Sequence, residues 1–236
     1  MKKNKGYTLA EMVISIAVGM VIIAAIYAAV NMGQRSTVNV ERKVAAHQDA
    51  RAAMELMSLE IQMASFNPTY ATGVWWVDPG SCTPAPGNQG NRGIPAATES
   101  SITVESDVNE NGVIGGTNNP NEVITYTYDS TNQYITRSTN CSGGGDQPFL
   151  GDLLSSGRPR TVRVINAVIN PAVPVFRYYN AQGTEITAQL PAGIPNISRI
   201  DITLWVETED VDVNSGQRRR MVYSTSVIPR NHVIKQ

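Results

Sequence analysis

Residues 6–30 read GYTLAEMVISIAVGMVIIAAIYAAV, and the rest of the chain is organised around this stretch. From Met12 to Val30 it contains no charged residue. An apolar run of about 20 residues is what a helix needs to cross the hydrocarbon core of a bilayer. Such a helix also satisfies its own backbone hydrogen bonds in lipid. The sequence therefore predicts a membrane-spanning helix over residues 7–30.

The carboxylate of Glu11 lies at the start of this apolar run. A charged side chain inside a membrane helix costs about 3 kcal/mol, so its presence indicates a function and a partner. An ordinary secretory signal places a small-residue cleavage site after the apolar core, whereas here the small residue, Gly6, comes before it. Cleavage after Gly6 would leave the helix on the mature chain. It would also create an ammonium group at Tyr7, a natural partner for Glu11 of the same or a neighbouring copy.

This N-terminus resembles that of type IV pilins and type II secretion pseudopilins. Their motif is a Gly, an aromatic residue that is usually Phe, Thr-Leu, and then a Glu. The resemblance implies that a prepilin peptidase cuts between Gly6 and Tyr7 and methylates the new amine of Tyr7. It also implies that Glu11 serves in assembly. Tyr7 in place of Phe is a departure from the usual motif, and a plain N-terminal anchor remains the alternative.

The resemblance further implies an α+β pilin fold, in which one long N-terminal helix packs on a mainly antiparallel β-sheet head. The expected divisions are a leader peptide (1–6), a transmembrane or filament-core half of the helix (7–30), an amphipathic half (31–67) and a periplasmic head (68–236). The implied partners are other pilins or pseudopilins, prepilin peptidase and an inner-membrane assembly platform. A structural subunit of this kind is not an enzyme.

Charge and cysteine content indicate the compartment. The net charge is -1, so nucleic acid is not an expected partner. Three lysines precede residue 6, which places the N-terminus in the cytoplasm and the head outside the inner membrane. Cys82 and Cys141 are the only cysteines, and an even pair in an oxidising compartment predicts a disulfide. Two free thiols are the alternative.

The pattern beyond residue 30 predicts that the helix continues to about Phe66, because Asn67-Pro68 disfavours further helix. An apolar stripe at helical spacing is expected to face the head. Its members are Ala45, Ala52, Leu56, Leu59, Met63 and Phe66.

Strand patterns dominate after residue 100, and none alternates with a helix, which favours antiparallel pairing. Alternation around a polar turn predicts a hairpin of residues 123–128 and 134–136. The other expected strands are 102–104, 161–169, 175–179, 197–207 and 219–227.

One loop reads D-x-N-x-N-G from Asp107, the pattern with which EF-hand-like loops wrap calcium. Asn118 stands where the final Glu is expected, so a longer loop would have to deliver Glu122. The predicted weak calcium ligands are Asp107, Asn109, Asn111, the carbonyl of Val113, and Glu122. An Asn/Gly-rich turn without metal is the alternative.

The remaining polar and aromatic features support no catalytic site. Trp75-Trp76 could stack on a ligand, and Arg218–Arg220 is expected to form surface salt bridges. His47 and His232 are the only histidines, and no nucleophile, phosphate-loop or zinc motif occurs. Apart from a possible calcium ion, no cofactor is expected.

The head also contains weaker family similarities. Residues 175–183 and 226–231 are similar to segments of PilW-type minor pilins and J-type pseudopilins. The resemblance therefore favours a minor type IV pilin. The alternatives are a J-type pseudopilin of type II secretion and a pilus-tip adhesin or binding module.

Overall fold

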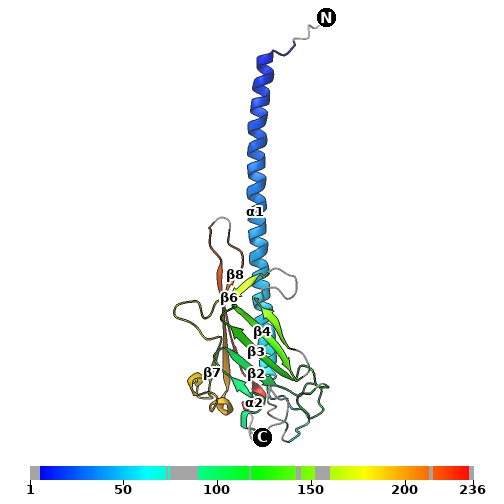
Figure 1. Cartoon of the computed structure of the whole chain (residues 1–236), viewed down its shortest axis with the longest axis vertical. Coiled ribbons are helices and arrows are strands. Elements are labelled where there is room, and N and C mark those ends of the chain that lie inside the picture. Colours follow the sequence, from blue (N-terminus) through cyan, green and yellow to red (C-terminus); the bar gives the residue numbers. More distant parts are fainter. Residues whose placement is uncertain are drawn as a thin grey trace.

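The computed structural model describes residues 6–72, 74, 90–116, 118–141, 145–151, 160–212 and 215–233. Its dominant element is α1 (Leu9–Gln62), an unbroken helix of 54 residues. At about 1.5 Å per residue this helix is about 80 Å long. Its first half projects away from the head and its second half packs on it (Figure 1). The single long helix predicted from the sequence is confirmed.

Two antiparallel sheets form the head. The first has the order β1-β2-β3-β4-β5, with β1 Ala96–Ala97, β2 Ser101–Glu105, β3 Val123–Asp129, β4 Tyr134–Asn140 and β5 Asp146–Leu150. The second contains β6 Val162–Val164, β7 Phe176–Tyr179, β8 Arg199–Thr208 and β9 Arg220–Val227. Every strand pair in the described ranges is antiparallel. The predicted α+β class is therefore confirmed, with two sheets in place of one.

Strand β8 is the centre of the second sheet. Residues 200–207 of β8 pair with β9 along one edge of β8. Its other edge pairs with β7 at one end and with β6 at the other end. Asn166 fills the gap between them and is only 1% exposed. Its Nδ2 donates to the carbonyl of Thr203 (2.8 Å), and its Oδ1 accepts from the N–H of Trp205 (2.8 Å). A side-chain amide thus replaces a missing stretch of main-chain ladder.

The predicted apolar stripe of α1 is wrong. Leu56 and Leu59 are 41% and 59% exposed. The helix has apolar residues on more than one face. The face that the sheets cover begins with alanines, whose small side chains allow close approach, and continues with larger apolar residues. The residues buried on that face are Ala46, Ala50, Ala53, Met54, Met57 and Ile61.

Several element boundaries also differ from those predicted. The helix ends at Gln62, with Met63 as its cap, rather than near Phe66. The strand expected over 161–169 is shorter and consists only of β6. The chain turns after Ile165, and this turn places Asn166 between β6 and β7. Strand β5 was not predicted, since Pro148 argues against a strand, but it lies at a sheet edge, where proline is tolerated.

The C-terminal helix α2 (Arg230–Val233) closes the head through His232. The imidazole is 2% exposed, and both ring nitrogens face main-chain carbonyls. Nδ1 lies 2.7 Å from Arg92 O and Nε2 lies 2.9 Å from Ile194 O. Burial lowers the pKa of His232 below its usual range, although the two carbonyls favour the protonated ring. Desolvation therefore disfavours the charged form of this ring in the native protein.

This burial predicts a pH dependence of stability. As pH falls from about 7.5 to about 5.5, the unfolded chain takes up a proton that the native His232 resists, so the free energy of unfolding should decrease. Denaturation of the detergent-solubilised chain across this range measures the effect. His232→Gln should flatten the profile. The same slope in the His232 variant would contradict this assignment.

Candidate assembly site on the N-terminal helix

The first turn of α1 forms a reciprocal cap around Glu11. The carboxylate Oε2 of Glu11 accepts from the backbone N–H of Thr8 (2.8 Å) and from its Oγ1 (3.0 Å). The N–H of Glu11 donates in return to Thr8 Oγ1 (3.3 Å). This capping box satisfies backbone donors that the helix start leaves free, and it sets the carboxylate at the positive end of the helix dipole. The role of Thr8 was not predicted, although the T-x-x-E spacing would have revealed it.

The cap places the predicted cleavage point beside this carboxylate. Gly6 and Tyr7 immediately precede the N-cap and are exposed. Tyr7 is one residue before the N–H that already bonds to Glu11. A new ammonium group on Tyr7 would therefore be only one residue from a backbone N–H that already donates to the Glu11 carboxylate. The Glu11 carboxylate is thus hydrogen-bonded within its own chain, and its side chain remains exposed, so that a second copy of the chain could reach it.

The apolar half of α1 is uncovered in the single subunit. The helix is long and apolar enough to cross a membrane, and none of its most apolar window is buried. The large exposed side chains along its start include Leu9, Met12, Ile14, Met20, Val21, Ile23 and Tyr27. Exposed apolar surface on this scale requires lipid or partner helices to cover it. This half of the helix is therefore a membrane anchor or an interface.

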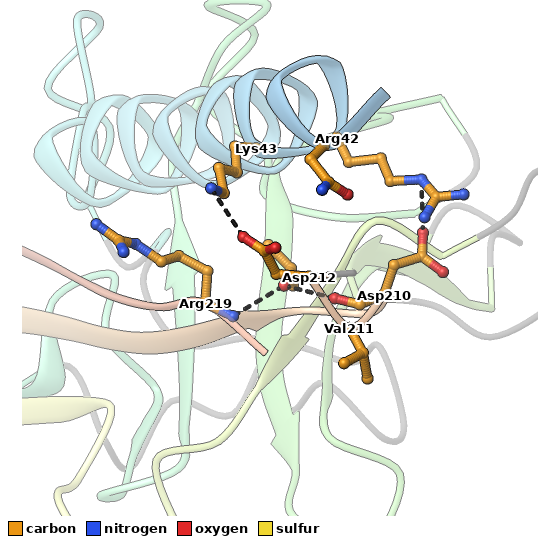
Figure 2. Close-up of a pocket in the computed structure, with 8 residues that line it drawn as sticks. Arg42, Lys43, Asp210, Val211, Asp212 and Arg219 are labelled. Carbon is orange, nitrogen blue, oxygen red and sulfur yellow. Dashed lines mark hydrogen bonds and ion pairs between the residues drawn. The ribbon is translucent and has the colours of Figure 1, made fainter. Parts of the chain in front are cut away.

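A polar contact, here called the helix clasp, holds α1 near the start of the part that packs on the head. It consists of Asn39, Arg42 and Lys43 of α1 with Asp210 and Asp212 after β8 (Figure 2). Arg42 pairs with Asp210 at 3.2 Å, and Lys43 pairs with Asp212 at 3.1 Å. Partly exposed pairs of this kind contribute about 0–1 kcal/mol each. The clasp therefore orients the helix more than it stabilises the fold.

Asn39 adds a buried polar group to the clasp. Among the residues that the structure describes, its side-chain Nδ2 has no hydrogen-bond partner, and the residue is 7% exposed. The adjoining cavity has a volume of about 10 Å³, which is about the space that one water occupies. Val211 and Thr208 also line this cavity, and Thr208 Oγ1 accepts from the N–H of Arg219 (3.1 Å). The clasp is thus a polar contact with room for one solvent molecule.

A partly buried ion cluster anchors the other end of α1 to the first sheet. Arg137 of β4 binds Glu60 of α1 in a bidentate manner, with Nε–Oε2 at 3.1 Å and Nη2–Oε1 at 2.7 Å. Tyr126, which faces Arg137 across the β3–β4 pair, donates its hydroxyl to Glu60. Burial, and then the bond to Glu60, raise the pKa of Tyr126, so the phenol stays protonated. Together with the clasp, this cluster sets the direction in which the helix projects.

The structure brings the predicted calcium-loop residues together in a compact loop. Asp107 and Glu122 are 0% and 1% exposed, and burial raises the pKa of Glu122. Asp107 accepts from the N–H groups of Asn111 (3.1 Å) and Gly112 (2.9 Å). Glu122 accepts from the N–H of Asn109 (3.3 Å). The acidic oxygens are therefore already engaged by N–H groups of the loop.

Asn119, which was not predicted, occupies the middle of this loop. Its Oδ1 accepts from the Nδ2 groups of Asn109 (2.7 Å) and Asn111 (2.8 Å). Its own Nδ2 donates to the carbonyls of Val113 (2.9 Å) and Gly115 (2.7 Å). Asn118, at the expected ligand position, is exposed. These bonds close the loop without a metal, so the calcium site remains a proposal.

The calcium proposal makes a direct prediction. Calcium at about ten times a millimolar Kd should add about 1.4 kcal/mol to the free energy of unfolding, and magnesium at the same concentration should add less. Denaturation of the detergent-solubilised chain with and without each ion measures this increment. The increment should vanish in Asp107→Asn. No calcium effect at about 10 mM would mean that the loop is an Asn/Gly-rich turn held by its own hydrogen bonds.

The other sequence predictions have varied outcomes. Trp75-Trp76 and Cys82 lie outside the described residues, so the Cys82–Cys141 disulfide stays a prediction. His47 is exposed, as expected, and its Nδ1 lies 2.6 Å from Tyr223 Oη. Of the arginine run, Arg220 pairs with Glu207 (3.4 Å), whereas Arg218 donates to the carbonyl of Glu209 (2.9 Å).

Comparison with known proteins identifies the N-terminal segment. A family model described as the prokaryotic N-terminal methylation motif matches residues 1–27. The chain matches no curated protein and no solved structure. The matched residues contain Gly6, Tyr7 and the cap around Glu11, and they begin the helix that projects from the head. Together with the long apolar helix and the antiparallel sheets, this match supports assignment of the chain to the type IV pilin and pseudopilin family.

Proposed function

We propose that this protein is a minor type IV pilin, a structural subunit that enters a pilus through α1. Prepilin peptidase cuts between Gly6 and Tyr7 and methylates the amine of Tyr7. The observation that carries this proposal is the capped Glu11 at the start of the exposed apolar half of α1, within a matched methylation motif. A J-type pseudopilin of type II secretion is the alternative.

The proposed route begins in the inner membrane. The lysines before residue 6 keep the N-terminus cytoplasmic, and the head lies in the periplasm. On assembly, the apolar half of α1 exchanges lipid for neighbouring helices, so its surface stays covered. Glu11 then pairs with the N-terminal ammonium group of an adjacent subunit. A carboxylate left without that partner in an apolar filament core is costly, and this cost favours insertion in register.

The head is the reason for proposing a minor component. Its segments 175–183 and 226–231 are similar to those of PilW-type minor pilins and J-type pseudopilins. The first contains β7 and the turn after it, and the second joins the end of β9 to α2. Both lie in the part of the head away from the free half of the helix (Figure 1). The proposed partners are other pilins, which contact the subunit through α1, and the membrane assembly platform.

The N-terminal residue and intact mass of the cell-expressed chain test the proposal. With prepilin peptidase present, the chain should begin at N-methyl-Tyr7, and without it at Met1. Gly6→Val should block cleavage, whereas Gly33→Ala, at another exposed glycine with free space around its Cα, should not. A chain that begins at Met1 in both cases would refute processing. Recovery of the processed chain in sheared pili, rather than with a type II secretion complex, separates the two candidates.

A further inference from the structure

A polar cleft lies at the end of the head farthest from the N-terminus. It is formed by the turn after β7, the 3-10 helix η2 (Thr187–Gln189) and the segment from η3 (Ile194–Asn196) to the start of β8. Its volume is about 440 Å³. In Figure 1 these segments are the gold loops at the lower left, opposite the N-terminal end. A subunit held by α1 would turn this end away from the membrane.

Uncharged amide side chains line the cleft: Asn180, Gln182, Gln189 and Asn196, with the hydroxyl of Ser198. Each amide offers both donors and an acceptor. The Oδ1 of Asn180 accepts from the N–H of Gln182 (3.1 Å) and of Thr184 (2.9 Å). In the described ranges, the other four side chains make no intramolecular hydrogen bond, so their polar groups are available to a ligand.

The amides sit on a fixed frame with an apolar floor. Ile186 and Ile197 line the cleft and are 3% and 1% exposed. The N–H of Gly193 donates to Gln189 O (3.0 Å), and the N–H of Ser198 donates to the carbonyl of Tyr179 (2.8 Å). These bonds fix the backbone that carries the amides. Because these isoleucines are buried, the apolar surface that a ligand would meet comes from the exposed Ala181 and Pro195, which line the cleft beside the amides.

Within the part of the chain that the structure describes, no charged side chain lines the cleft. Arg199, which follows Ser198, pairs with Asp201 (3.1 Å) and lies over the ring of Tyr179 at 4.1 Å. Glu185, which precedes Ile186, also lies outside the lining. An anionic or cationic ligand would lose water here without gaining an opposite charge. A neutral ligand with many hydroxyl groups matches the amides, and its C–H faces match the exposed apolar side chains of Ala181 and Pro195.

We propose that this cleft binds a neutral saccharide. Sugar hydroxyls act as both donor and acceptor, as the amides of Gln189 and Asn196 do, so each can complete the other's hydrogen bonds. Pockets of a few hundred Å³ accommodate small ligands, and the cleft falls in that range. The binding does not depend on processing or filament insertion, so it can hold or fail independently of the proposed function.

Saturation-transfer NMR on the full chain tests the proposal in a detergent that carries no sugar. The probes are maltotriose, cellotriose, chitotriose, mannotriose and lactose, each at about 10 mM, above the millimolar Kd at which weak binding is detected. At least one probe should receive saturation. Gln189→Ala with Asn196→Ala should raise its Kd about tenfold or more, because two hydrogen-bonding groups are lost. Both residues are exposed, so the variant should keep the unfolding transition of the parent chain.

The matched control is Gln147→Ala with Gln217→Ala, which removes two exposed amides outside the cleft and should leave the Kd unchanged. If lactose is the ligand, its sialylated form should bind no more tightly, because the cleft has no cation. The proposal is overturned if no probe receives saturation, or if the cleft variant binds as tightly as the control. Binding only of an uncharged Gly-Ser peptide would also overturn it, in favour of a polypeptide ligand.

Discussion

Glu60→Ala is expected to lower the free energy of unfolding by about 2 kcal/mol, because removing one partner leaves the charge of the other partly buried and unpaired. Arg137 would lose its bidentate carboxylate with only 20% of its side chain exposed. Tyr126 would also lose the acceptor of its hydroxyl. Chemical denaturation of the full chain in detergent measures the loss.

The matched control for this prediction is Asp210→Ala, which breaks the pair with Arg42, in which both side chains are about half exposed (52% and 47%). That change should cost about 0.5 kcal/mol, as is typical of solvent-exposed pairs. Removing both Glu60 and Arg137, by Glu60→Met with Arg137→Met, should cost less than Glu60→Ala alone, because no unpaired charge remains. A loss in Glu60→Ala no larger than that of the control would show that the cluster does not anchor α1.

Glu11→Ala is expected to leave processing intact but to reduce incorporation into filaments by at least about tenfold. A hydrogen-bonded charge pair contributes about 1.5 kcal/mol or more, and that free energy changes an equilibrium tenfold. The measurement is the amount of processed chain in sheared filaments relative to the membrane fraction. Normal incorporation of Glu11→Ala would refute the proposed mechanism.

The cap around Glu11 allows its charge to be separated from its local role. Glu11→Gln keeps a side chain that can still accept from Thr8, but it removes the charge. If inter-subunit charge pairing drives insertion, this variant should fail as Glu11→Ala does. Thr8→Ala removes the side-chain half of the cap and should be incorporated nearly normally. The opposite pattern would show that Glu11 acts by starting the helix and not by pairing with a neighbour.

The sequence predicted the features that depend on neighbouring residues. The apolar run and its flanking motif defined α1, and the matched family model covers the same residues. Strand β8 alternates strictly between part-buried and buried residues, as its sequence pattern predicted. Such periodicities arise within one element, so one chain segment is enough to reveal them.

Only the tertiary structure decided which surfaces meet. Periodicity shows that a helix has faces, but it does not show which face a sheet will cover, and Ala50 rather than Leu56 is buried. Glu60 and Arg137 are 77 residues apart along the chain, and the carbonyl of Thr203 that Asn166 binds lies 37 residues away. These contacts, and the amide-lined cleft, exist because separate segments are packed together. The N-terminal motif needed no such packing, because its chemistry is contained in consecutive residues.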